Sequence, residues 1–274
     1  MAKSQRIMKI FLSGLILFAL GAAFLQGKSY SEKTNFRNHL AKPPIDSSKK
    51  YTIYLTIDDG PLEGAPFIDS VVKDEQIPVD LFLVGIHANS GRIFMRYLNM
   101  LRNDKWMELN NHSYTHANDN YDLYYSHPRK VLKDIRLNND SLHFTNKICR
   151  MPARNMWRID NKKFNDGFSG DKTADLLKRK GYQVMGWDLE WASDSLGHPL
   201  QSPDSLFDQL QVAFKNNDSF LPGNVVLLCH DWMFITPKFK QELQRFIQLV
   251  KGAGNIRFEW LSSYPGYKKD KHFI

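Results

Sequence analysis

The chain has 274 residues, of which 42% are hydrophobic and 13% aromatic, a composition typical of one sizeable globular domain and not of a disordered or fibrous protein. The formal net charge of +8 is modest and is spread along the sequence, without a basic block interleaved with aromatic residues. Nucleic acid is therefore excluded as the expected partner, whereas an anionic envelope polymer is compatible with this charge.

The N-terminal segment predicts export. Three basic residues lie within the first nine positions, and an uncharged, mostly apolar run follows over residues 10–27. This order is that of a signal peptide, and the run is just long enough to remain as a membrane anchor. Residues 1–27 are therefore expected to be a cleaved signal or a retained anchor, in a protein that is periplasmic or extracellular and has no other membrane contact. Residues 28–50 are polar and predict a linker, which leaves residues 51–274 as the folded domain.

Within that domain, predicted strands alternate with predicted helices about seven times, which indicates a parallel sheet. The strands are expected at residues 51–57, 79–84, 106–109, 147–151, 182–187, 225–229 and 256–260. The helices are expected at residues 67–73, 93–101, 173–180, 203–216, 236–250 and in the segment that follows the predicted cap Ser126. Apolar residues on both faces of the strands predict burial on both sides. The number of repeats favours a closed barrel over an open sheet, and the predicted fold class is α/β, a distorted (β/α)7-type barrel.

The two cysteines, Cys149 and Cys229, each lie within a predicted strand. Export would permit a disulfide between them. Small apolar residues are at home inside buried strands, so we expect two buried thiols instead.

Polar residues follow the predicted strands at their C-terminal ends, which is the face where barrel active sites form. These residues are Asp58 and Asp59, His112 and His116, Arg150, the segment 188–190, and His230 with Asp231. Their common position predicts an active site more strongly than any single motif does. The other histidines, among them His87, have no partner at a useful spacing and are expected to be structural or exposed.

His112 and His116 have the spacing of metal ligands, because side chains four residues apart share one face of a helical turn. The alternative is that two surface or core histidines fall four apart by chance. With Asp59 they would form an Asp-His-His set that leaves one position for water, as catalytic zinc sites do. Zn²⁺ is the expected ion, with Co²⁺, Ni²⁺ and Mn²⁺ as alternatives.

Three more residues could supply the acid–base chemistry. Asp58 is the expected general base for the metal-bound water, since strand alternation should turn it away from the ion itself. Arg150 could hold Asp58 ionised through a bidentate pair, and His230 could protonate the leaving group.

These motifs resemble those of the NodB-type polysaccharide deacetylases, the fourth carbohydrate esterase family. The family pattern T-F-D-D-G-P is similar to residues 56–61, and N-H-[ST]-x-x-H is similar to residues 111–116. The strand at residues 79–85 and the L-x-H pattern at residues 228–230 also match. The resemblance implies a distorted NodB-like barrel and a metal-dependent hydrolase that removes N-acetyl or O-acetyl groups from sugars. In this resemblance Asp58 is the base, Asp59, His112 and His116 are the ligands, and His230 is the acid.

Two family motifs are altered here. The pattern R-P-P-Y becomes Arg150-Met151-Pro152-Ala153, so an aromatic residue is lost where the family uses a backbone N–H for the oxyanion. The pattern D-x-x-D-W is poorly kept over residues 187–194, and the acid that tunes His230 could be Glu190 or Asp194.

The residues expected to bind the substrate are Ala153, Arg154, Tyr114, Trp191 and Trp232, because aromatic rings stack on sugar faces. For each ring the alternative is packing against the barrel rim. The expected substrate is an acetylated amino-sugar polysaccharide or oligosaccharide. Two other functions stay open: a small-molecule amide or ester hydrolase, and a non-catalytic carbohydrate-binding protein on the same barrel.

Overall fold

A computed structural model describes residues 46–268. The predicted signal or anchor and most of the predicted linker therefore lie outside the described residues. Within residues 46–268, no helix is both long and apolar enough to cross a membrane.

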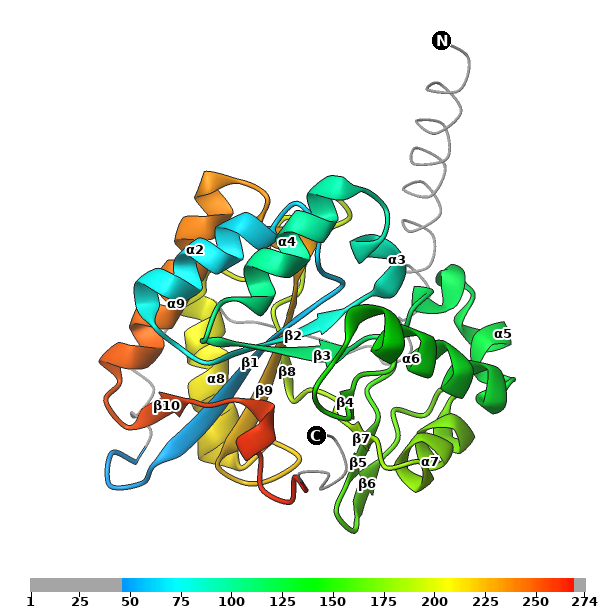
Figure 1. The fold of residues 1–274 in the computed structure, drawn as a ribbon. Helices are drawn as coiled ribbons and strands as arrows, with labels where there is room; N and C mark the ends of the chain where they lie inside the picture. The colour runs from blue at the N-terminus through cyan, green and yellow to red at the C-terminus, as the bar shows by residue number, and fades with distance from the viewer. Residues whose placement is uncertain (1–45, 269–274) are drawn as a thin grey trace.

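The described chain alternates strands and helices, and Figure 1 shows the helices as an outer layer around a curled sheet. The strands are β1 (Tyr51–Asp58), β2 (Val79–Leu83), β3 (Met107–Asn111), β4 (Ile148–Cys149), β5 (Trp157–Ile159), β6 (Lys162–Phe164), β7 (Gln183–Val184), β8 (Leu189–Glu190), β9 (Asn224–His230) and β10 (Ile256–Phe258). The α-helices are α2 (Ala65–Glu75), α3 (Gly85–Ala88), α4 (Arg92–Arg102), α5 (Tyr121–Tyr125), α6 (Pro128–Leu142), α7 (Asp171–Arg179), α8 (Pro203–Asn216) and α9 (Pro237–Gly252). Short 3₁₀ turns are η2 (His116–Asp119), η3 (Asp231–Phe234) and η4 (Leu261–Ser263).

The sheet confirms the predicted α/β fold but corrects the expected closure. Its strand order is β6-β5-β7-β4-β3-β2-β1-β9-β8, with β10 paired to the first part of β1, so β6 and β8 are free edges of a half-barrel. All pairs are parallel except those that involve β5. The edge strands are short, with three residues in β6 and two in β8, and large side chains fill the interior: Trp157 stacks on Phe220 with ring centroids 4.4 Å apart.

Strand β1 separates two apolar layers and thereby sets the direction of the acids that follow it. Ile53, Leu55 and Ile57 pack under the helices, whereas Tyr54 belongs to the interior cluster on the opposite face. Because side chains alternate along a strand, Asp58 shares the interior face with Tyr54. Apolar packing of β1 is therefore sufficient to point the Asp58 side chain into the interior, without any polar contact.

Two smaller predictions have clear outcomes. Cys149 and Cys229 are buried free thiols, as expected. Ser126 does not cap α6, because it ends α5 instead, and α6 begins at Pro128 with His127 at the N-cap. Proline fits the first turn of a helix, where its missing N–H costs nothing, and the helix boundary lies one residue later than predicted.

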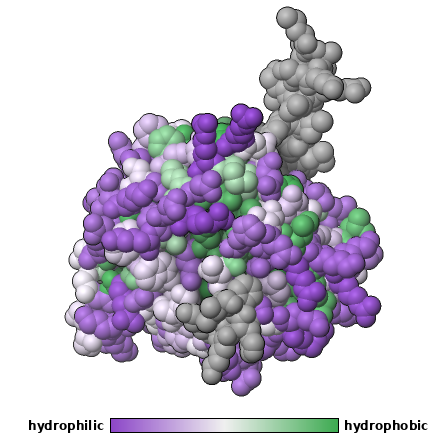
Figure 2. All heavy atoms as spheres, in the orientation of Figure 1, coloured by the Kyte–Doolittle hydropathy of each residue, from purple (hydrophilic) through white to green (hydrophobic). Residues whose placement is uncertain are grey.

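The surface is mostly hydrophilic on the face shown in Figure 2, and apolar side chains appear there only in small groups. The apolar residues lie in the core instead. Trp191 is 0% exposed, and its ring packs between Phe234 and Phe246 at centroid distances of 5.8 and 5.6 Å.

We expect Trp191→Ala to lower the free energy of unfolding by about 3–5 kcal/mol, because it removes a large, fully enclosed side chain. Denaturant unfolding of the purified protein measures this. Leu196→Ala is the control: Leu196 is 70% exposed, and its truncation should change stability by less than about 0.5 kcal/mol. Equal effects of the two substitutions would contradict the position given to Trp191.

Candidate active site

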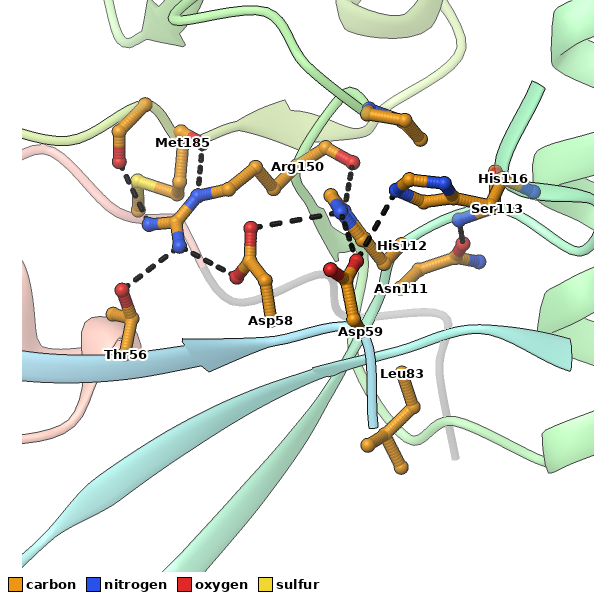
Figure 3. A network of polar contacts seen from close by, with 12 residues as sticks. Thr56, Asp58, Asp59, Leu83, Asn111, His112, Ser113, His116, Arg150 and Met185 are labelled. Atoms are coloured by element: carbon orange, nitrogen blue, oxygen red, sulfur yellow. Dashed lines mark hydrogen bonds and ion pairs between the residues drawn. The ribbon is translucent and has the colours of Figure 1, made fainter. Parts of the chain in front are cut away.

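The site lies where β1 ends, and it begins with two adjacent acids that face different partners. Asp58 is 2% exposed and lies on the interior face of the half-barrel. Asp59 follows with a φ of +71°, a left-handed conformation that is uncommon for any residue except glycine. Figure 3 shows the two carboxylates side by side, with Asp59 facing the histidines and Asp58 facing Arg150.

Asp59, His112 and His116 form a cluster that fits a metal ion. Their ligand atoms all lie within 4.8 Å of one another. Asp59 Oδ1 is 3.4 Å from His112 Nε2 and 3.1 Å from His116 Nε2, yet within the described residues this buried oxygen has no hydrogen-bond partner. A buried acceptor without a partner is costly, and a cation between these atoms would satisfy it. Two imidazoles and one carboxylate are also the donor set of catalytic zinc sites.

The neighbours of the cluster already select the ligating atoms. The backbone carbonyl of Arg150 lies 3.0 Å from His112 Nδ1 and can only accept, so Nδ1 carries the proton and Nε2 keeps its lone pair. Burial raises the pKa of Asp59, but the charge of His116 and the close approach of both imidazoles outweigh it and hold this pKa well below its usual range. Asp59 is therefore ionised, which is the state that a carboxylate ligand requires.

The two histidines do not share a helical turn, which corrects the reasoning from their spacing. His112 follows β3 directly and His116 begins η2, and between them the chain passes through a φ of +69° at Ser113. Side-chain hydrogen bonds hold this loop: Asn111 Oδ1 accepts from the Ser113 N–H at 2.9 Å, and Asp134 accepts from the N–H of Thr115 at 3.2 Å. Polar side chains that bond to nearby backbone offer an alternative to the helix, and here that alternative brings both imidazoles to Asp59.

Arg150 is fully buried, and its guanidinium orients Asp58. Its Nη1 donates to Asp58 Oδ1 at 2.7 Å and to Thr56 Oγ1 at 2.8 Å, while its other nitrogens donate to the carbonyls of Met185 and Gly186 at 3.2 and 2.8 Å. The expected bidentate pair is therefore wrong, because one hydrogen bond joins the two groups. Asp58 Oδ2 stays clear of the arginine and lies 3.5 Å from His112 Nε2.

His230 ends β9 and is paired in register with Asp58 on β1, so both residues lie at the same edge of adjacent strands. Its ring stacks on Trp232 at a centroid distance of 5.1 Å. Neither acid proposed to tune it forms a hydrogen bond or ion pair with His230 in residues 46–268. Glu190 is exposed, and Asp194 pairs with the His198 ring at 3.1 Å.

The residues predicted to bind substrate fall in different places. Ala153 is exposed, with a φ of +53°, at the start of the loop beyond Arg150. Tyr114 is half-buried against Gly85, where an added Cβ would approach the tyrosine ring to 2.2 Å. Arg154 is 7% exposed, and its guanidinium donates to Ser169 and Asp122.

The assignment of Trp191 to the substrate surface is wrong, because this side chain is enclosed in the core. Trp232 is half-buried beside the cluster, and its indole N–H donates to Asp59 Oδ2 at 3.1 Å.

Sequence reasoning missed His87, which was expected to be structural or exposed. Its Nδ1 lies 2.6 Å from the backbone carbonyl of Asp59, and its ring centroid is 6.3 Å from that of His116. The available signal was its position just after β2, at the same edge of the sheet as the other polar residues.

The fold and the site together define a half-barrel protein with an Asp-His-His cluster and a buried Asp–Arg pair at the C-terminal edge of its sheet. The sequence model of the family described as polysaccharide deacetylase matches residues 46–185, just over half of the chain. The chain belongs to this family.

Individual relatives are distant. Chitin disaccharide deacetylase of Vibrio alginolyticus is 24% identical over 310 aligned positions, which cover 78% of this chain and 71% of the relative. The catalytic domain of a peptidoglycan N-acetylglucosamine deacetylase from Eubacterium rectale is 18% identical, with a TM-score of 0.57 and coverage of 84% of this chain and 97% of that domain. A carbohydrate esterase family 4 pseudoenzyme from Bacillus anthracis has a TM-score of 0.55 at 18% identity, over 78% of this chain and 64% of that one. Because a pseudoenzyme shares the fold, an argument for catalysis must rest on the site residues.

We expect His112→Ala to abolish tight binding of one Zn²⁺ per chain, because it removes one of three donors that the surrounding hydrogen bonds orient. Competition with a coloured zinc chelator measures this on metal-free protein. His127→Ala, at an exposed histidine outside the cluster, should bind zinc like the wild type. Unchanged zinc affinity in His112→Ala would contradict the ligand set.

Proposed function

We propose that the protein is a metal-dependent deacetylase that hydrolyses the acetyl group of N-acetylated amino sugars. The observation that carries this proposal is the position of Asp58. Its carboxylate lies directly beside the Asp-His-His cluster, with Oδ1 held by Arg150 and Oδ2 on the side of His112. A binding protein would have no need of an oriented, buried base at a metal cluster.

Asp59, His112 and His116 would hold the ion, and Zn²⁺ fits their nitrogen and oxygen donors best. When bound, a divalent cation supplies Lewis-acid chemistry: it lowers the pKa of water and polarises an acyl oxygen. The protein's own part is proton transfer. Asp58 Oδ2 would accept a proton as water attacks the acetyl carbon, and His230 would give a proton to the amine nitrogen as the C–N bond breaks.

The hydrogen bonds of Arg150 support the role of Asp58 as a base and not as a further ligand. The guanidinium keeps its charge at any physiological pH and places it 2.7 Å from Asp58 Oδ1, which leaves Oδ2 to accept a proton. Because Arg150 also donates to Thr56 and to two backbone carbonyls, its position does not depend on the protonation of Asp58. The acid could therefore gain and lose a proton without rearrangement around it.

The names of the relatives indicate the substrate class. One acts on chitin disaccharide and another on peptidoglycan N-acetylglucosamine, so an acetylated amino-sugar oligomer or polymer is the proposed substrate. Ala153 is proposed to offer its backbone N–H to the acetyl oxygen, since it lies exposed at the loop that follows Arg150. Export to the periplasm or the extracellular space is proposed on the sequence of residues 1–27 alone.

The experiment that tests this function is acetate release from chitin oligosaccharides and from peptidoglycan, by metal-free protein with and without added Zn²⁺. We expect release only with the ion and complete loss with a chelator. Acetate release that is equal with and without metal would contradict the mechanism. Glycan binding without any release would favour the non-catalytic alternative that the pseudoenzyme relative represents.

We expect Asp58→Asn to bind Zn²⁺ like the wild type but to lower kcat by about 10²–10⁴-fold, since it removes a general base and not a ligand. It also leaves the Arg150 charge without a counter-ion, so thermal unfolding must confirm that the variant is folded at the assay temperature. Thr56→Val is the matched control, because it removes another partner of Arg150 and keeps the carboxylate. Wild-type turnover in Asp58→Asn would show that the base is another group.

A further inference from the structure

Asp59 ligates from a conformation that needs support. Its φ of +71° lies in the left-handed region, which costs a non-glycine residue about 1–3 kcal/mol unless its surroundings impose it. The strand before it would otherwise continue and carry the next side chain to the opposite face of the sheet. The contacts that hold Asp59 in this conformation therefore determine whether its carboxylate can join His112 and His116.

One support reaches the backbone of Asp59 from α3. His87 Nδ1 lies 2.6 Å from the Asp59 carbonyl oxygen, and since a carbonyl only accepts, Nδ1 is the donor. The hydrogen bond fixes the peptide that follows Asp59. The same ring lies 6.3 Å from the ring of the ligand His116, so His87 borders the cluster without belonging to it.

The other support reaches the carboxylate from the turn after β9. The indole N–H of Trp232 donates to Asp59 Oδ2 at 3.1 Å, and this leaves Oδ1 as the atom that faces both imidazoles. The indole is itself held in place. It stacks on His230 at an interplanar angle of 25°, and the loop residue Gly197 lies so close that an added Cβ would be 3.1 Å from the ring.

We propose that His87 and Trp232 are positioning residues that fix Asp59 as a metal ligand, one through its backbone carbonyl and the other through its outer carboxylate oxygen. This inference rests on the proposed metal site. It assigns to Trp232 a role other than sugar stacking, and to His87 a role that its sequence position did not indicate. Partners that orient a ligand in this way commonly contribute about 10- to 100-fold to metal affinity.

The test is Zn²⁺ affinity, measured by chelator competition on metal-free protein, together with the Tm of the metal-free form. Trp232→Phe keeps a stacked ring and removes only the N–H, and His87→Leu removes the donor to Asp59. Each should weaken Zn²⁺ binding by about 10- to 100-fold. The Tm of the metal-free variants should stay within about 3 °C of the wild type, which a purely structural role would not predict.

Two further variants make the test specific. His87→Asn places an amide N–H near the former Nδ1 and should recover most of the affinity lost in His87→Leu. Trp260→Phe removes a comparable indole hydrogen bond, at 3.1 Å to the Trp106 carbonyl, away from the cluster and should bind zinc like the wild type.

Wild-type zinc affinity in Trp232→Phe and His87→Leu would overturn the inference and leave the metal site intact. An equal loss in Trp260→Phe would also overturn it. If the wild-type protein itself binds no Zn²⁺, the proposed metal site fails, and this inference fails with it.

Discussion

The buried guanidinium of Arg150 is the constraint on which the rest of the site depends. Its side chain holds Asp58 at 2.7 Å, and its backbone carbonyl fixes the tautomer of His112 at 3.0 Å. Its backbone N–H donates to Asn111, the residue before His112, at 3.0 Å. A fully buried charge is costly to desolvate and is tolerated only when its hydrogen bonds are met, as they are here by one carboxylate, one hydroxyl and two carbonyls. One residue thus orients both the proposed base and a proposed ligand.

The half-barrel explains why these groups meet at all. Parallel strands bring their C-terminal ends to one edge, and β1, β3, β4 and β9 end there with Asp58, Asn111, Cys149 and His230. Asp59, His112 and Arg150 follow in loops and are no longer bound by the alternation of a strand. Their side chains can therefore point toward one another. The positive φ values at Asp59, Ser113 and His116 show that the turns are sharp, and the side-chain hydrogen bonds around them offset the cost.

Much of this site could be predicted because strand ends are visible in a sequence. Apolar runs locate β1, β2 and β9, and the acids and histidines that follow them stand out against the runs. Barrel closure could not be predicted, since it depends on whether the edge strands β6 and β8 pair, and apolar runs locate strands without saying which edges meet. His87 was missed because its partner is a backbone carbonyl, which has no sequence signature. Trp191 and Trp232 looked alike in the sequence, yet one packs in the core and the other donates to a ligand.

The family match establishes the fold, but a pseudoenzyme shares that fold. The case for catalysis therefore rests on the side chains of the site. The most direct test is anomalous diffraction at the zinc edge from crystals of zinc-loaded protein. We predict one strong peak from a zinc ion that Asp59 Oδ1, His112 Nε2 and His116 Nε2 bind at about 2.0–2.2 Å. A zinc ion held by other residues, or an Asp59 carboxylate turned away from both imidazoles, would contradict it.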